Sequence, residues 1–326
     1  MRGRAWLGAL ALAFALAHGT AMAEPEADAV APTAGPQPAI RSELAAHSLL
    51  LDATRAGDRL VAVGQWGHVV LSDDRGETWR QARAVPLRTT LTGVHFSDAK
   101  HGWAVGHDAV VLHSEDGGEE WAVQHAAPEL ESPLLSVWVG EDGHGLAVGA
   151  FSLVLETRDG GQHWTRGAAP GGEDADAHLN AIFEGPGSSL LIAAEGGYVY
   201  RSRDGGQSWE TLSPPYTGSF WNGLALPGGG VMVFGLRGHA FRSEDSGTNW
   251  TLVETGTDKS LTGGVVLGPD RVALVGLGGV VLSSGDGGRS FALRTRPHRR
   301  SLTAVEAGRS GQLLLFGETG VEHIDE

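Results

Sequence analysis

The sequence predicts an all-β fold, a seven-bladed β-propeller, and three observations support this prediction. A motif with an aspartate, a glycine and an aromatic residue recurs six times, and its aspartates are separated by 42, 43, 45, 41 and 41 residues. Glycine is frequent, with 50 residues among 326, which is typical of many short strands joined by turns. The end of the chain, from Leu302 to Ile324, repeats the apolar pattern of the earlier units. A fixed period of this length indicates blades arranged in a ring.

The repeated motif is an Asp box, and its first copy spans residues 72–79. The box aspartate can accept backbone N–H groups across a hairpin, and the glycine can supply a positive φ. The aromatic residue can fill the gap between neighbouring blades. We therefore expect a structural role for the six box aspartates, which are Asp74, Asp116, Asp159, Asp204, Asp245 and Asp286.

Each period also contains three further apolar segments. Leu60–Gly64 and His68–Leu71 read as two short strands that meet at a tight turn, and Leu91–Phe96 reads as the strand that begins the next unit. With the strand that follows the box, each period holds four strands, which is one propeller blade.

The ring is expected to close through the N-terminus. Leu302 to Ile324 supplies three strands of a last blade, and the segment Pro38–Ala46 is the natural donor of the fourth. This N-terminal strand would complete the last blade and leave no sheet edge unpaired. A six-bladed ring with a loose C-terminal tail is the alternative.

The first residues read as a secretory signal, with Arg2 and Arg4 before the apolar run Trp6–Ala17 and a small-residue cleavage site at Ala21–Ala23. No later apolar run reaches the roughly 20 residues that a spanning helix needs. We therefore expect a soluble, periplasmic protein that does not span the membrane after cleavage and is monomeric. The expected division of the chain is a signal peptide at 1–23, a flexible N-terminal segment at 24–37 and the propeller at 38–326.

Charge and composition exclude several classes of function. The formal net charge is −15, which argues against nucleic acid as a partner. The absence of cysteine excludes disulfides and thiolate chemistry. Four histidines crowd the second unit, but their spacing matches no compact ligand motif, so we expect no metal and no cofactor. They are His101, His107, His113 and His125.

Several segments together resemble the photosystem II stability and assembly factor family. They are Leu60–Gly64, the box at 72–79, Leu91–Phe96 and His101–His107. The resemblance implies a seven-bladed propeller of the thylakoid lumen or the bacterial periplasm that is not an enzyme and binds a membrane-protein subunit during assembly. The partner it implies is an exposed segment of a membrane protein or of an envelope transporter complex.

Candidate binding residues lie where the sequence departs from the repeat, chiefly at the turns between the second and third strands. Trp66 is either an anchor for a partner or a lid over the core, and Trp221 is either a second anchor or the start of a buried strand. The basic cluster at 294–300 either steers an acidic partner or is a solvated loop. The candidate partner-binding residues are Trp66, His107, Asp108, Phe151, Glu195, Trp221, Arg237, Arg299 and Arg300.

An enzyme of the Asp-box class, such as a sialidase, would need a tyrosine nucleophile and an arginine triad. The tyrosines are Tyr198 and Tyr200, which are expected within a regular third strand, and Tyr216. Arg237 is the single arginine at an inner turn. We therefore expect no catalytic residues, with a carbohydrate-binding or sialidase-like propeller as the alternative function.

Overall fold

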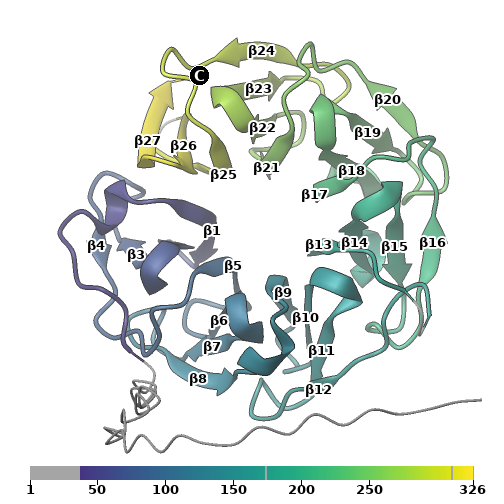
Figure 1. Ribbon diagram of the computed structural model, residues 1–326. Coiled ribbons are helices and arrows are strands. Elements are labelled where there is room, and N and C mark those ends of the chain that lie inside the picture. The colour runs from purple at the N-terminus through teal and green to yellow at the C-terminus, as the bar shows by residue number, and fades with distance from the viewer. Residues whose placement is uncertain (1–36, 173–174, 310, 326) are drawn as a thin grey trace, which may run out of the picture. The chain divides into compact units, whose positions relative to one another are not determined.

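The computed structural model describes residues 37–172, 175–309 and 311–325, which form a ring of seven antiparallel β-sheets (Figure 1). This confirms the predicted seven-bladed β-propeller. The expected signal peptide at 1–23 and all but the last residue of the segment 24–37 lie outside the described residues. Within the described part of the chain, no helix is long and apolar enough to cross a membrane.

The strands of each blade follow one another from the centre of the ring to its rim, as Figure 1 shows. Because consecutive strands pair with each other, each blade is a meander of local contacts. The strands of the first four blades are β1 (Leu50–Ala56), β2 (Arg59–Gly64), β3 (Val69–Ser72) and β4 (Arg80–Gln81); β5 (Leu91–Phe96), β6 (Gly102–Gly106), β7 (Val111–Ser114) and β8 (Ala122–His125); β9 (Leu134–Val139), β10 (Gly145–Gly149), β11 (Val154–Thr157) and β12 (Thr165–Arg166); β13 (Leu179–Glu184), β14 (Leu190–Ala194), β15 (Val199–Ser202) and β16 (Glu210–Leu212). The remaining strands are β17 (Phe220–Leu226), β18 (Gly230–Gly235), β19 (Ala240–Ser243) and β20 (Thr251–Val253); β21 (Leu261–Val266), β22 (Val272–Gly276), β23 (Val280–Ser284) and β24 (Ala292–Thr295); β25 (Leu302–Ala307), β26 (Gln312–Gly317) and β27 (Gly320–Asp325).

The ring contains short 3-10 turns, and six of them join the second strand of a blade to the third. These six inner turns are η2 (Gln65–Gly67), η3 (His107–Ala109), η5 (Ala150–Ser152), η7 (Glu195–Gly197), η9 (Leu236–Gly238) and η10 (Leu277–Gly279). The others are η1 (Ala45–His47), η4 (Pro128–Leu130), η6 (Pro186–Ser188) and η8 (Pro227–Gly229). The inner turns lie at one end of the third strands and the box loops at the other, so the ring has a turn face and a box face.

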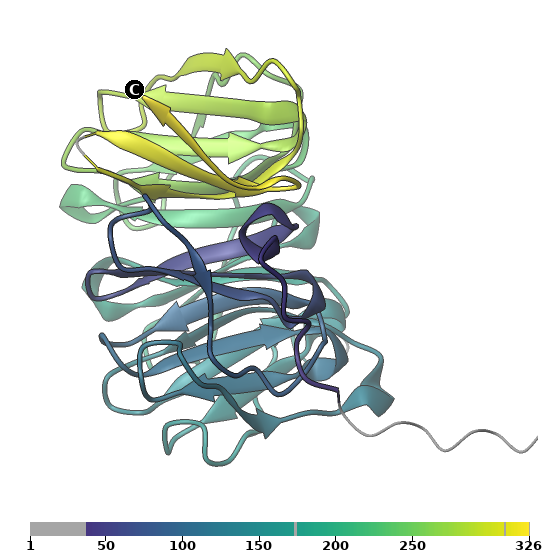
Figure 2. The same ribbon diagram turned by 90° about the vertical axis from the view of Figure 1, so that its left-hand side faces the viewer.

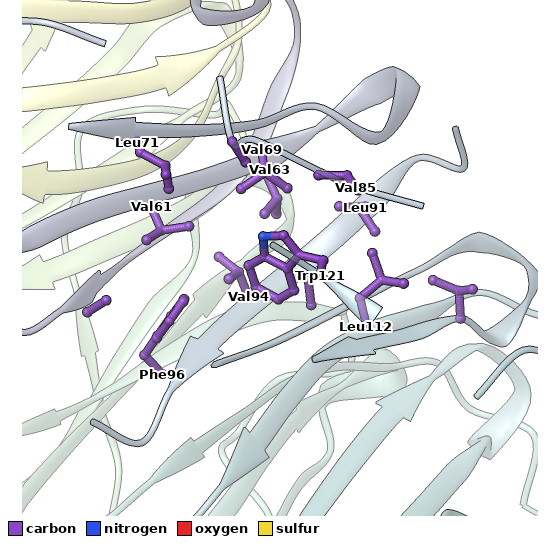
Figure 3. Close-up of a cluster of buried hydrophobic side chains, with 14 residues drawn as sticks. Val61, Val63, Val69, Leu71, Val85, Leu91, Val94, Phe96, Leu112 and Trp121 are labelled. Carbon is purple, nitrogen blue, oxygen red and sulfur yellow. The ribbon is translucent and has the colours of Figure 1, made fainter. Parts of the chain in front are cut away.

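The core lies between the blades. Figure 3 shows the cluster between the first two blades, where the indole of Trp121 packs among aliphatic side chains of both. Trp121 is 5% exposed, and its Nε1 donates to the carbonyl of Gly118 at 2.9 Å. The aromatic residue of this box thus fills the space between blades, as expected from the motif.

Each box loop is held by hydrogen bonds of its own side chains. The hydroxyl of Ser72 donates to Asp74 at 2.8 Å and accepts the N–H of Gly76 at 2.8 Å. Asp74 also accepts the backbone N–H of Thr78 at 2.9 Å. The bonds from the Thr78 side chain and backbone lower the pKa of Asp74 to about 2. The glycine N–H donates to a serine or threonine hydroxyl in the five other boxes too, at Gly118, Gly161, Gly206, Gly247 and Gly288.

The first strand of every blade carries a register shift after its first residue, which turns the second residue towards the central channel. Three of these second residues are threonines, whose hydroxyls donate to a backbone carbonyl of the next blade. The pairs are Thr92 with Leu134 at 2.6 Å, Thr262 with Leu302 at 2.7 Å and Thr303 with Leu50 at 2.7 Å. The last of them joins the seventh blade to the first and closes the ring.

The prediction that Pro38–Ala46 completes the last blade is wrong. In the described residues the last sheet has three strands, β25, β26 and β27, and the N-terminal segment crosses the first blade instead. The amide of Gln81 donates to the carbonyl of Ile40 at 2.7 Å, and its oxygen accepts the N–H of Ser42 at 3.1 Å. Because these backbone groups are satisfied on the first blade, the segment does not pair with β27.

Candidate functional site

The inner turns of the turn face share an unusual backbone geometry. Their second and third residues have positive φ, which is the geometry of a tight hairpin turn and favours glycine at both positions. A residue with a Cβ pays about 1–2 kcal/mol for this conformation. Two turns have glycine at the second position, Gly196 and Gly278, whereas the four others have Trp66 (φ 60°), Asp108 (φ 59°), Phe151 (φ 53°) and Arg237 (φ 57°).

These four non-glycine residues are also exposed, so burial does not account for their identity. Trp66 is 50% exposed and Phe151 is 60% exposed, and both are among the most exposed large apolar residues described. Asp108 and Arg237 are exposed as well. Strained residues with accessible side chains are typical of binding sites. The turn face is therefore the candidate functional site.

A contiguous group forms where the third and fourth blades meet. The ring of Phe151 packs against His178, with ring centroids 4.9 Å apart, and the N–H of Phe151 donates to Nδ1 of His178 at 3.3 Å. The backbone N–H of His178 donates to Glu195 at 3.2 Å. The structure thus brings together two predicted residues, Phe151 and Glu195, through His178.

Sequence reasoning missed His178 and Tyr198. His178 lies in the connection before β13, which follows no repeat, so no pattern marked it. Tyr198 was expected inside a third strand, but it precedes β15 and is 47% exposed beside the inner turn η7. An aromatic residue next to the two glycines of that turn was the available signal.

The surroundings of Arg237 do not resemble a tyrosine-nucleophile site. The hydroxyl of Tyr216 donates to the carbonyl of Leu236 at 3.0 Å, and its ring stacks on His239 with centroids 4.4 Å apart. Burial raises the pKa of Tyr216 and also that of Tyr200, which is buried. A raised pKa keeps both phenols protonated, which is the opposite of what a nucleophile requires.

The structure places Trp221 in β17, where it lines the central channel rather than an inter-blade loop. It borders a cleft of about 280 Å³ to which every blade contributes the second residue of its first strand. The lining residues are Leu51, Thr92, Leu135, Asn180, Trp221, Thr262 and Thr303.

Arg299 and Arg300 are exposed in the connection between β24 and β25 and lie beside η10, since a Cβ on Gly279 would stand 3.2 Å from the Cα of Arg299. On η3, His107 is exposed, and Asp108 accepts the hydroxyl of Thr89 at 2.9 Å. The predicted residues other than Trp221 therefore lie on the turn face, spread around the ring.

Potential metal ligands do not gather in the second blade. His101 stacks with His113 at a centroid distance of 6.2 Å and bonds to Asp98 at 2.8 Å. Among the described residues, no group of three or more histidine or acidic side chains has the geometry to hold a metal ion.

Comparison with known proteins supports the same family as the sequence motifs. The model of the family described as "Photosynthesis system II assembly factor YCF48" matches residues 81–135 and 127–268, more than half of the chain. The photosystem II assembly protein Ycf48 of Synechococcus sp. (strain JA-3-3Ab) is 40% identical over 172 residues, 51% of this chain and 45% of the relative. The Ycf48 of Synechococcus sp. (strain JA-2-3B'a(2-13)) is 37% identical over 145 residues, 40% of this chain and 39% of the relative. The matched part thus spans less than half of the length of these curated relatives.

Solved structures confirm the fold. A structure described as YCF48 bound to D1 peptide has a TM-score of 0.70 and 20% identity, and the match covers 87% of this chain and 97% of that one. The WD40 β-propeller domain of Doa1 has a TM-score of 0.67 and 13% identity, covering 86% of this chain and 94% of that one. The fold alone is therefore shared by proteins of different function. Because the family model matches more than half of its length, the chain belongs to the Ycf48 family of photosystem II assembly factors.

Proposed function

We propose that this protein is a periplasmic, non-enzymatic assembly factor that holds an exposed segment of a membrane protein against its turn face. The observation that carries the proposal is the set of four exposed residues, Trp66, Asp108, Phe151 and Arg237, that occupy a backbone conformation costly for any residue with a Cβ. Family membership supports an assembly role, and a relative described as bound to a D1 peptide supports a peptide-like client.

The chemistry of the turn face suits an extended polypeptide segment. Trp66 and Phe151 offer apolar anchors, while Asp108 and Arg237 offer a hydrogen-bond acceptor and a planar cation. Neighbouring blades place such groups at intervals along the ring, so that a segment lying across the face meets several of them. Burial raises the pKa of Tyr200 and Tyr216, which disfavours either phenol as the nucleophile of the sialidase-like alternative.

The proposal is tested by placing a photo-crosslinking amino acid at Trp66 or Phe151 and irradiating the protein with envelope membranes of its host. We expect both positions to crosslink to one exposed segment of one membrane protein, identified by mass spectrometry. Arg75 is the matched control position, because it has φ 62° and is exposed, but it lies on the box face.

A crosslink pattern that is the same at all three positions would contradict the proposal, because it would place no specific site on the turn face. Recovery of glycans instead of protein would favour the carbohydrate-binding alternative. Substitution of Arg237 by alanine should reduce the crosslinking yield while the melting temperature stays unchanged, since its side chain is exposed.

A further inference from the structure

The seventh blade lacks the outer strand that each other blade has. Within the described residues, its sheet ends at β27, which pairs with β26 alone. Figure 2 shows this strand at the rim of the ring, next to the first blade. The free edge of a strand presents unpaired N–H and C=O groups to any extended chain that approaches.

The blade interface next to this edge differs from the others. Five other blade interfaces contain a box aromatic. In each of them the aromatic residue shares an apolar cluster with a residue that lies in the fourth strand of the preceding blade or just after that strand. The pairs are Ala82 with Trp121, Ala127 with Trp164, Ala169 with Trp209, Leu212 with Trp250 and Val253 with Phe291.

At the closing interface the corresponding aromatic residue is Trp79, whose apolar cluster contains Ala45 and Ala46 of the N-terminal segment in place of a fourth-strand residue. Its ring packs edge-on against Phe316 of β26, at a centroid distance of 5.7 Å. Beside it opens a cleft of about 550 Å³, whose other lining residues are Arg41, Ser42, Glu43, Ala45, Ala46, Arg80 and Gln81. At this interface the N-terminal segment and a cleft therefore take the place of a fourth strand.

The opposite side of the free edge is basic. Arg294 and Arg296 stand two residues apart at the end of the sixth blade, and both reach the seventh. Arg294 donates to the carbonyl of Asp325 at 3.3 Å, and Arg296 donates to Glu322 at 3.0 Å. Whereas Arg296 is paired with that carboxylate, Arg294 has no ion-pair partner among the described residues. A strand laid along β27 would thus have the apolar cluster of Trp79, Ala46 and Val321 on one side and guanidinium groups on the other.

We propose that β27 accepts an extended segment of a partner protein as the fourth strand of the seventh blade. The segment alternates small or medium apolar residues, which face Trp79, with acidic residues, which face Arg294 and Arg296. Side chains of a strand point alternately to its two sides, so this pattern has a period of two residues. This surface lies on the rim of the ring and is separate from the turn face.

The test measures fluorescence anisotropy of a labelled eight-residue peptide in which leucine alternates with glutamate. A peptide of the same composition, with the four leucines and the four glutamates in two blocks, is the matched control. We expect saturable binding of the alternating peptide to the mature chain and about tenfold weaker binding of the block peptide. Arg294→Glu should weaken the alternating peptide about tenfold, because a guanidinium–carboxylate contact becomes a repulsion. Arg166→Glu, an exposed arginine on the fourth strand β12, should leave the affinity unchanged.

Three outcomes would overturn the proposal. Equal affinity for both peptides, or an equal loss with Arg294→Glu and Arg166→Glu, would show unspecific attraction. Dimerisation in analytical ultracentrifugation that is abolished by Arg294→Glu would assign the edge to a second copy of the chain. Binding to a chain that begins at residue 37, but not to the mature chain, would show that the protein's own N-terminus excludes a partner. Circular dichroism melts of each variant show that it is folded.

Discussion

Residues with positive φ occur in tight turns on both faces of the ring, but the residue types at these positions differ between the faces. On the box face, all six boxes place a glycine with φ between 79° and 96° at a position where a Cβ would stand 3.2 Å or less from a neighbouring side chain. On the turn face, the second residue of the inner turn is glycine in two blades and Trp66, Asp108, Phe151 or Arg237 in the others. Uniform residues satisfy a demand of packing. Varied residues with positive φ occur on both faces, with Arg75 and Ser246 on the box face, but the exposed aromatic ones, Trp66 and Phe151, lie on the turn face. The box face is thus part of the scaffold, and the turn face is the candidate binding surface.

The largest effect is expected from acid, which acts on the whole box face. Hydrogen bonds within the boxes lower the pKa of Asp74, Asp159, Asp204 and Asp245 to about 2. A carboxylate whose pKa is depressed in the folded protein contributes stability above its unfolded pKa of about 4 and loses it as the pH falls towards 2. Urea unfolding at pH 5, 4, 3 and 2 should show a steep loss of the free energy of unfolding. Asp204→Asn should make this loss smaller, and an unchanged loss would contradict the role of the box.

A single methyl group should distinguish the faces. Gly206 on the box face has φ 86°, and an added Cβ would stand 2.5 Å from Leu146, so Gly206→Ala should lower the free energy of unfolding by about 2–4 kcal/mol. Gly196 on the turn face has φ 71°, and its Cβ would meet the ring of the exposed Tyr198 at 3.1 Å. Because that ring can move, Gly196→Ala should cost about 1 kcal/mol. Equal losses in urea unfolding would remove the proposed difference between the faces.

Asp52 in β1 should make the free energy of unfolding depend on pH in the direction opposite to that of the box aspartates. Burial raises the pKa of Asp52 to about 7, and nearby Glu306 adds to the shift, while N–H bonds from Val94 and Ala53 oppose it. A raised pKa contributes stability below the unfolded pKa of about 4 and loses it as the pH rises through 7. Between pH 5 and pH 8 the free energy of unfolding of the native chain should therefore fall relative to that of the Asp52→Asn variant. A difference between the two that stays constant over this range would contradict the assignment to Asp52.

The smallest effect on stability is expected on the turn face, together with a loss of binding. Trp66→Gly and Phe151→Gly relieve positive φ at exposed positions, so each should leave the melting temperature unchanged or raise it slightly. Client capture should fall in both variants. Arg75→Gly makes the same backbone change on the box face and should leave capture intact. A lower melting temperature with Trp66→Gly would instead make Trp66 a lid over the core.

The repeat was predictable because each blade depends on contacts within about 45 residues. In addition, the residue types of the box indicate which hydrogen bonds it forms. The path of the N-terminal segment was not predictable in the same way. It depends on contacts with the first blade that compete with pairing to β27. Among them, Gln81 bridges Ile40 and Ser42, and the N–H of Ala39 donates to the carbonyl of Val85 at 3.0 Å. Similarly, His178 joins the candidate site through packing on Phe151 across two blades, which no local pattern encodes.

The bond from Thr303 to Leu50 closes the ring in the same way as the bond from Thr92 to Leu134 joins two consecutive blades. On the channel side, the interface at which the chain is interrupted is therefore chemically equivalent to one that the chain crosses. It follows that the order of blades around the circle and the order of blades along the gene are separable. A circular permutant, with the old ends joined by a linker and new ends placed in another inter-blade connection, should rebuild the same ring of inner strands.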